Sequence, residues 1–406
     1  MKVLLVHNSY QLPGGEDVVY KRERDLLVSR GDEVVEYLRS NKEIEQYSLV
    51  QHLKLAPGVI WSSESRRDFS QLLRRTKPDV VHVHNTFMVI SPSIYSACRE
   101  QQVPVVQTLH NYRLLCPQGS FIRNGKPCHD CASSLGHSIL HGCYRGSRVK
   151  TATVATMIAA HRALGTYSEL VDRYIALTEF SRSTFVAGGL DPAKITVKPN
   201  FVDPDPGERA NDGSYALFVG RIEPEKGLRT LLAAWRQLPE RIPLRLAGTG
   251  PLAEELNVAA KELGTQVQYV GQVPLDQLMK LMGGARFLIF PSELYENFPL
   301  TLAEAYACGV PVIASELGAM KEIVKHESTG LLFRPGDADD LAAKVWHAWT
   351  NRERMRQLGR QARKEYESKY TADLNYRSLR RIYEGVLKSD ARPTADTRDD
   401  KEAVLV

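Results

Sequence analysis

Short apolar runs alternate with amphipathic segments along this sequence, and that alternation constrains the fold more than any other feature. The first half opens with KVLLVH at residues 2–7, and a helical pattern follows from Val18 to Arg30. The same order of strand and helix repeats up to the run VPVVQTLHN at residues 103–111. Strands separated by helices in this way predict a parallel sheet with helices on both faces.

A second cycle of strands and helices begins at YALFVGR, residues 215–221, and reaches VPVIAS at residues 310–315. Between the cycles lies DPDPGERANDGS, which is rich in Pro, Gly and Asp and predicts a linker. A chain of 406 residues also exceeds what one hydrophobic core usually serves. The sequence therefore predicts an α/β fold of two doubly wound, Rossmann-like domains. They should face each other across a cleft, where ligands of such sheets bind.

We expect the domain boundaries to follow the two cycles. The expected parts are a first domain at residues 1–201 with an insertion at 111–150, a second domain at 202–370, a helix at 371–388 that packs back on the first domain, and a disordered tail at 389–406.

The insertion is basic and rich in cysteine. Seven basic residues and one acidic residue, Asp130, lie between Asn111 and Gly165, so the positive field is local. Four of the six cysteines fall within 28 residues and form the cluster Cys116, Cys128, Cys131 and Cys143. A Cys-x2-Cys pair with two further cysteines in a cytoplasmic chain is typical of a structural zinc site. Four reduced thiols, or a loop held by a disulfide, are the alternatives.

The expected cellular compartment follows from the lack of a predicted membrane-spanning run and of a predicted signal peptide. No run reaches the roughly 18 to 20 apolar residues of a membrane-spanning helix, and the start MKVLLVHNSY is too short and too polar for a signal peptide. We therefore expect a cytoplasmic protein. The basic first domain permits a peripheral contact with the inner face of the membrane without requiring one.

Two carboxylates eight positions apart, Glu296 and Glu304, lie in the mostly apolar stretch PSELYENFPLTLAEAYACG. The preceding FLIFPS predicts a buried strand, and Pro299 suits the start of a helix. The spacing puts the two backbones roughly 8 to 15 Å apart, which is long for two carboxylates working across one glycosidic bond. It fits two contacts along one elongated ligand, with a phosphate between them at the helix amino terminus.

A second pattern lies in GRIEPEKG at residues 220–227, directly after a predicted strand. It offers Arg221 and Lys226, five positions apart, at the carboxyl end of that strand. The guanidinium fork and the lysine ammonium are the usual phosphate partners in proteins. Together with the two glutamates, this loop indicates a phosphate-bearing ligand in the cleft.

These motifs, together with LAGTGP and YVGQVP, resemble those of the glycosyltransferases of family 4, which are retaining enzymes of the GT-B architecture. The resemblance covers most of residues 215–350. In the first half it extends through PGGE, TLHNY, ALTEFSR and KPNFVD. Two positions depart from the family's pattern, since Asn297 stands where a glycine is common and Gly318-Ala319 replaces a Gly-Gly pair.

The resemblance implies an activity: transfer of a sugar from a nucleoside-diphosphate sugar to a hydroxyl of a saccharide or lipid-linked acceptor on the first-domain side. It implies retention of configuration, no metal at the diphosphate, and a place in surface or extracellular polysaccharide or glycolipid synthesis. The implied catalytic residues are His110, Arg221, Lys226 and Glu296. The implied donor-binding residues are Gly14, Gly15, Arg221, Lys226, Asn297, Phe298, Pro299, Leu300 and Glu304.

Two other functions are compatible with parts of the sequence. A sugar-nucleotide epimerase or hydrolase could use the same architecture. A zinc-ordered basic module that binds nucleic acid could use the insertion, with the α/β body as scaffold. The insertion has only Phe121 and Tyr144 as aromatic residues between Leu114 and Lys150, which does not favour stacking on nucleic acid bases.

Overall fold

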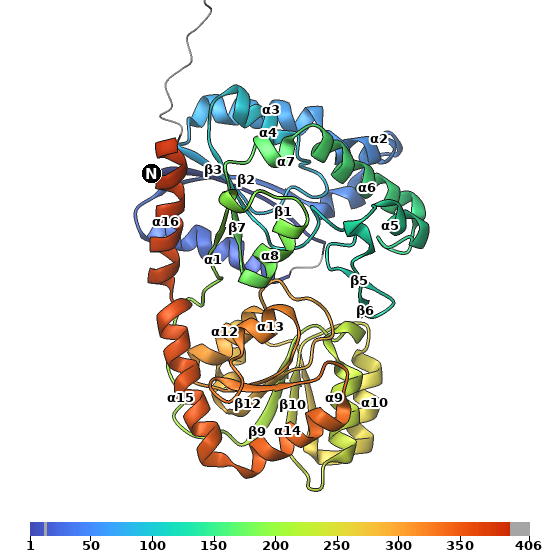
Figure 1. Ribbon diagram of the computed structural model, residues 1–406, viewed down its shortest axis with the longest axis vertical. Coiled ribbons are helices and arrows are strands. Elements are labelled where there is room, and N and C mark those ends of the chain that lie inside the picture. Colours follow the sequence, from blue (N-terminus) through green and yellow to red (C-terminus); the bar gives the residue numbers. More distant parts are fainter. Residues whose placement is uncertain (12–13, 390–406) are drawn as a thin grey trace, which may run out of the picture.

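The computed structural model describes residues 1–11 and 14–389. It contains two α/β domains, each built on a six-stranded parallel sheet with helices on both faces (Figure 1). The predicted fold class is confirmed. Nearly all of the tail expected to be disordered, residues 390–406, lies outside the described residues.

The first sheet has the order β2-β1-β3-β4-β7-β8. Its strands are β1 (Lys2–Ser9), β2 (Glu33–Ser40), β3 (Val80–Val83), β4 (Val105–Thr108), β7 (Arg173–Ala176) and β8 (Ile195–Val197). Its helices are α1 (Gly15–Ser29), α2 (Leu49–Ile60), α3 (Ser63–Thr76), α4 (Ile94–Glu100), α6 (Arg148–Ala163), α7 (Thr166–Glu169) and α8 (Glu179–Ala187).

The second sheet has the order β11-β10-β9-β12-β13-β14. Its strands are β9 (Tyr215–Val219), β10 (Leu244–Ala247), β11 (Val267–Gly271), β12 (Ala285–Phe290), β13 (Val312–Ser315) and β14 (Gly330–Phe333). Its helices are α9 (Leu228–Gln237), α10 (Ala253–Leu263), α11 (Leu275–Gly283), α12 (Leu300–Ala307), α13 (Gly318–Ile323), α14 (Ala338–Thr350) and α15 (Arg352–Lys369).

Both strand orders reverse direction once, and the reversals decide where a ligand can bind. In the first sheet β1 lies between β2 and β3, and in the second β9 lies between β10 and β12. Connections leave these neighbouring strands toward opposite faces, so a crevice opens at their carboxyl ends. The two crevices face each other across the gap between the domains.

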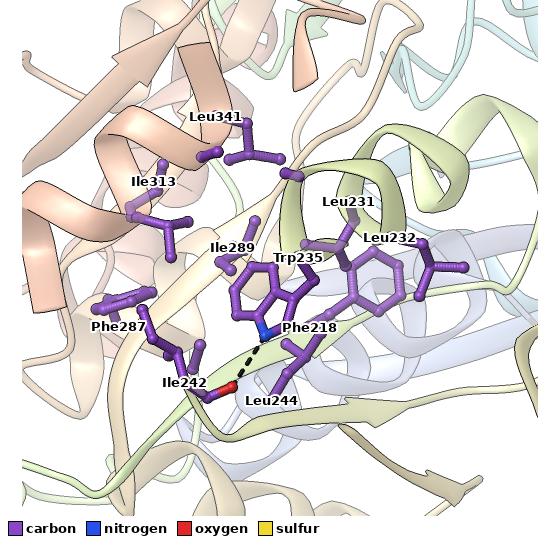
Figure 2. Close-up of a cluster of buried hydrophobic side chains, with 14 of the residues drawn as sticks. Phe218, Leu231, Leu232, Trp235, Ile242, Leu244, Phe287, Ile289, Ile313 and Leu341 are labelled. Carbon is purple, nitrogen blue, oxygen red and sulfur yellow. Dashed lines mark hydrogen bonds between the residues drawn. The ribbon is translucent and has the colours of Figure 1, made fainter. Parts of the chain in front are cut away.

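The cores are apolar because the central strands are buried on both faces. Figure 2 shows part of the core of the second domain, where Trp235 of α9 packs among Phe218, Ile289 and Ile313. The indole Nε1 donates to the Ile242 carbonyl at 2.9 Å, so this large ring is buried with its polar atom satisfied. A rigid core of this kind holds the ends of the neighbouring strands in fixed positions.

The chain passes between the domains twice. It leaves the first domain after β8 and returns after α15 into α16 (Ala372–Ser389), which packs on the first domain through Leu379, Ile382 and Tyr383 (Figure 1). The two passages touch, since the amide of Val202 donates to the carbonyl of Tyr370 at 2.9 Å. The two links therefore lie side by side at one edge of the molecule.

The insertion forms a small subdomain beside the cleft. It contains the hairpin of β5 (Ile122–Arg123) and β6 (Lys126–Pro127) and the helix α5 (Gly136–His141). Its His129 ring lies 5.2 Å from the ring of Tyr295 in the second domain, centroid to centroid. Among residues 1–11 and 14–389, no helix combines the length and the apolar character needed to span a bilayer.

Candidate functional site

A cavity of about 320 Å³ lies between the two domains, at the carboxyl ends of both sheets. The first domain contributes its wall at the start of α1 and after β4, and the second contributes the ends of β9 and β12. Of the predicted site residues, nine line it: Gly15, His110, Arg221, Lys226, Glu296, Asn297, Phe298, Pro299 and Leu300. Two distant motifs of the sequence, GRIEPEKG and SELYENFPL, therefore meet at one surface.

The basic loop after β9 is held in place by glycine. Gly227 has φ of +71°, and a Cβ there would lie 1.9 Å from the carbonyl oxygen of Pro291, at the end of β12. Only glycine combines that conformation with that close approach. The approach carries Lys226 over the start of the glutamate loop, where its Nζ lies 2.5 Å from Oε1 of Glu296. Ser292 donates to the same oxygen at 2.8 Å.

Arg221 is the more accessible cation. Its side chain is 55% exposed and pairs with the carboxylate of Glu223, two positions along the loop. A guanidinium held by a single partner at the edge of a cavity keeps donors for an incoming anion. Arg221 and Lys226 thus present two positive groups on the wall of the cavity.

The start of α12 forms the wall between the two cations and the first domain. The helix begins at Leu300, with Pro299 at its N-cap, one position later than the sequence suggested. The side-chain amide of Asn297 donates to the carbonyl of Leu109, and the backbone carbonyl of Asn297 accepts from Thr178 Oγ1 at 3.3 Å. Asn297, the departure from the family's glycine, therefore ties the second domain to the first.

Glu304 lies within α12, the helix that the sequence predicted after Pro299. It is only 5% exposed and does not line the cavity. Its Oε1 accepts a hydrogen bond from Arg22 Nη2 of α1 at 3.1 Å, across the gap between the domains. Burial raises the pKa of Glu304, and Arg22 opposes that rise. No pattern in the sequence distinguishes Arg22 from the other basic residues of α1.

His110 lies directly after β4, on the wall of the cavity that the first domain forms. Its Nε2 lies 3.0 Å from Nδ1 of His84, which follows β3. Burial lowers the pKa of both imidazoles well below the usual 6.5, so both rings are neutral. His84 has no counterpart among the residues that the sequence singled out.

Gly14 and Gly15, at the start of α1, differ in their position relative to the cavity. Gly15 lines the cavity, whereas the N–H of Gly14 donates to Asp17 Oδ2 at 2.8 Å and Gly14 lies off the cavity wall. A Cβ at either glycine would meet no protein atom within 4 Å. The turn therefore leaves open space toward the cleft.

Glu16, the next residue, was not predicted as part of the site. It lines the cavity, accepts from the amide of Asn111 at 3.3 Å, and keeps its Oε1 buried without a partner. Burial, reinforced by the charge of Asp17, raises the pKa of Glu16 to about 8. A carboxyl group that is neutral near pH 7 therefore lies on the cavity wall of the first domain.

Two family models divide the chain between them. The model described as Glycosyltransferase Family 4 matches residues 13–206, and the model described as Glycosyl transferases group 1 matches residues 202–365. The chain belongs to the glycosyltransferases of family 4. The family predicted from the sequence is confirmed, and the two matches meet at the passage between the two sheets.

Curated relatives of this glycosyltransferase match it over different lengths. O-antigen chain mannosyltransferase B of Escherichia coli is 31% identical over 42% of this chain, and the match spans half the length of that protein. The uncharacterized glycosyltransferase MJ1607 of Methanocaldococcus jannaschii is 25% identical over 92% of this chain and 95% of its own.

Solved structures share the GT-B fold of this glycosyltransferase. Sucrose-phosphate synthase from Thermosynechococcus elongatus has a TM-score of 0.71 at 17% identity, with 96% of this chain and 99% of that one covered. HepE of Anabaena in complex with UDP-glucose has a TM-score of 0.66 at 18% identity, with 95% and 100% covered. The predicted GT-B architecture is confirmed.

The four cysteines of the insertion, which the sequence predicts as a structural zinc site, are free thiols in the structure of this glycosyltransferase. A tetrahedral zinc site would hold its sulfur atoms about 3.8 Å apart. Among the described residues, the one group of three or more ligand-type side chains with ligand atoms within 4.8 Å of one another is Glu23, His82 and His84. In the part of the chain that the structure describes, no three of these thiols meet that limit. Zinc binding by the insertion stays a prediction.

Cys116 and Cys131 are neighbouring thiols within this cluster. A hydrogen bond from the Cys131 thiol, followed by backbone N–H groups of the turn after Cys116, lowers the pKa of Cys116 to about 6. The same contact raises the pKa of Cys131.

Proposed function

We propose that this protein transfers a sugar from a nucleoside-diphosphate sugar to an acceptor hydroxyl, with retention of the anomeric configuration. The observation that carries the proposal is the pair of cations, Arg221 and Lys226, on one wall of the cavity between the domains, beside the amino terminus of α12. A diphosphate placed there meets two positive side chains and the positive end of a helix dipole.

The chemistry of transfer fits this arrangement. As the bond between the anomeric carbon and the phosphate oxygen breaks, negative charge grows on the diphosphate, and Arg221 and Lys226 stabilise it. The acceptor oxygen bonds to the anomeric carbon on the same face, and its proton passes to the departing phosphate oxygen. No dedicated nucleophile is required. Glu296, held by Lys226 and Ser292, is assigned to the hydroxyls of the transferred sugar.

The donor's other end is assigned to Glu304. We propose that the ribose hydroxyls replace Arg22 as partners of this carboxylate when the nucleotide binds, with a small movement of α1 relative to α12. The ion pair with Arg22 keeps the carboxylate charged in the meantime, although burial alone would favour its neutral form. His110, Gly14, Gly15 and the backbone of Asn297 to Leu300 complete the proposed donor site.

The first-domain wall is assigned to the acceptor. The relatives include O-antigen and lipopolysaccharide glycosyltransferases and a sulfoquinovosyl transferase, which supports a saccharide or lipid-linked acceptor in surface polysaccharide or glycolipid synthesis. The insertion exposes Arg145, Arg148 and Lys150 next to Val149, which is 78% exposed. We propose that this basic and apolar face touches an anionic membrane surface that carries the acceptor.

The decisive experiment is a binding and turnover screen across nucleotide sugars in the presence of a chelator. The proposal expects one nucleotide sugar to bind, an acceptor-dependent release of nucleotide, and a product with the donor's anomeric configuration by NMR. Strict dependence on added magnesium or manganese would contradict the two-cation assignment. Complete conversion of the donor without acceptor would indicate the epimerase or hydrolase function instead.

A further inference from the structure

A row of imidazoles lies behind His110, inside the first domain. His84 stacks near His110 with ring centroids 5.2 Å apart and planes 18° apart, and His82 lies 4.4 Å from His84 on the other side. His82 belongs to β3, and His84 and His110 follow β3 and β4, which are neighbours in the sheet. The row therefore runs from the cavity into the interior.

The contact between His84 and His110 contains a single proton. The two nitrogens, Nδ1 of His84 and Nε2 of His110, lie 3.0 Å apart. Because both rings are neutral, each carries one N–H, and one of the two facing nitrogens must donate while the other accepts. The tautomer of His84 therefore decides the tautomer of His110.

The far side of His84 faces a carboxylate. Among the described residues, its buried Nε2 has no hydrogen-bond partner. Oε1 of Glu23 is also buried without a hydrogen bond there, and it lies 3.4 Å from Nδ1 of His82. Glu23 and His84 each offer a ligand-type atom within 4.8 Å of the other, a distance that one bridging water spans. The other oxygen of Glu23 accepts from Lys198 Nζ at 3.2 Å, and both side chains are only 1% exposed. Glu23 and Lys198 therefore form a buried ion pair.

An ionised carboxylate favours an N–H on the side of the imidazole that faces it. His84 then carries its proton on Nε2, toward Glu23, and its Nδ1 is the acceptor. His110 consequently donates from Nε2 and is left with a bare Nδ1. A neutral ring with a bare nitrogen accepts a hydrogen bond from a sugar hydroxyl in the cleft and does not add a positive charge beside the two cations.

A metal ion does not suit this group of side chains. Both nitrogens of His82 already have partners, since Nδ1 lies 2.8 Å from the Tyr383 hydroxyl and Nε2 lies 2.8 Å from Thr108 Oγ1. Lys198 also places a positive charge on Glu23. The group is built to hold hydrogen bonds.

We propose that His84 is a positioning residue that holds His110 in one tautomer, with its proton on Nε2, and that the Glu23 carboxylate, paired with Lys198, sets this choice through His84. The role of His110 toward substrate rests on the proposed function. The tautomer itself does not, because it is a property of the free protein.

The test is nitrogen-15 NMR of the full-length protein with labelled histidine and no nucleotide sugar. The His110 signals, assigned by their loss in His110→Gln, should show a proton on Nε2 alone and should not change between about pH 5 and 8. A proton on Nδ1, an equal mixture, or titration in that range would overturn the proposal.

Three variants separate positioning from simple packing. In His84→Asn the amide oxygen can still accept from His110, so the tautomer should persist. In His84→Leu no acceptor remains, so we expect a mixture of tautomers and a loss of about tenfold to a hundredfold in kcat, with a smaller change in donor KM. Glu23→Gln keeps the shape, removes the charge, and should also produce the mixture, which gives a second route if His84→Leu does not fold.

His161→Asn is the matched control. His161 is a buried histidine of the same domain, bonded to Thr166 and to the carbonyl of Ile60, and it does not line the cavity. The His110 spectrum and kcat should stay unchanged in this variant. Unchanged His110 signals in His84→Leu, or a metal ion bound by Glu23, His82 and His84, would contradict the proposal. Failure to bind any nucleotide sugar would instead count against the proposed function.

Discussion

At the scale of single residues, the two proposed ends of the donor should respond differently to substitution. Lys226→Ala removes a cation that acts on the departing diphosphate, so we expect kcat to fall by about a hundredfold to a thousandfold. Glu304→Gln removes the charged partner of the ribose, so we expect nucleotide affinity to fall by about tenfold or more. Steady-state kinetics and titration calorimetry measure the two effects.

Lys261→Ala is the control for the first substitution, because Lys261 is an exposed lysine on α10, away from the cavity. The donor assignment fails if Lys226→Ala and Glu304→Gln both keep the kinetics of the unmodified protein.

Glu16 makes stability depend on pH in a direction that can be measured. Its pKa is 4.5 as an ordinary glutamate and about 8 when folded, so between these values the folded protein holds a proton that the unfolded chain has lost. The contribution of the Glu16 carboxyl to the free energy of unfolding is therefore fully present below about pH 4.5. It is lost as the pH rises toward 8.

Glu16→Gln should remove that dependence. The Tm of the unmodified protein should fall relative to that of Glu16→Gln between about pH 5 and 8. Glu45→Gln, a change at an exposed glutamate of the same domain, should track the unmodified protein. A constant difference in Tm between the unmodified protein and Glu16→Gln across this range would show that Glu16 is ionised when folded.

At the scale of elements, the loop after β9 depends on Gly227. Gly227→Ala places a Cβ against the Pro291 carbonyl and demands a left-handed conformation that costs about 1 to 2 kcal/mol by itself. We expect lower stability and a loss of nucleotide binding, because Lys226 moves away from Glu296. Gly283→Ala, at the end of α11 with no atom within 4 Å, should leave binding intact. Differential scanning calorimetry and nucleotide titration give both results, and equal behaviour of the two variants would contradict this account.

The sequence predicted strands and helices well where hydrophobic periodicity and a glycine turn occur together. The strand, turn and helix around Gly227 follow from local chemistry, and so does the placement of Arg221 and Lys226 on one wall. Helix α2 was missed because Pro57 interrupts the pattern. In the structure Pro57 lies in the last turn of α2, where its missing N–H removes one hydrogen bond of the helix, and Ser48 caps the other end.

Contacts between distant elements could not be predicted in the same way. Arg22 and Glu304 are 282 positions apart, and nothing in either neighbourhood distinguishes Arg22 from other basic residues of α1. The cysteine spacing shows which thiols could meet and does not show how the loop between them folds, so the zinc site stays a prediction. The unpredicted role of His84 has the same cause, since it arises from the adjacency of β3 and β4.

At the scale of the whole molecule, Glu322 holds the domains together. Its two carboxylate oxygens accept from the amides of Glu179 and Phe180 at 2.9 and 2.8 Å, so a side chain of the second domain caps α8 of the first. Hydrogen bonds to a charged group contribute about 1.5 to 3 kcal/mol. Glu322→Ala should therefore shift the free protein toward an open arrangement.

Small-angle scattering measures that shift as a larger radius of gyration, which donor binding should reverse. Glu316→Ala is the control, because Glu316 pairs with Lys321 on the surface of its own domain. An unchanged radius in Glu322→Ala would mean that the Asn297 and Arg22 contacts suffice to keep the cleft closed.

The paired passages of the chain at Val202 and Tyr370 also determine how the protein responds to a cut by a protease. A single protease cut at either passage leaves the other as a covalent link, and α16 stays docked through its apolar face. A nicked molecule should therefore migrate as two fragments in denaturing gels and yet elute as one body under native conditions. The two connections together therefore keep the domains associated after one of them is cut.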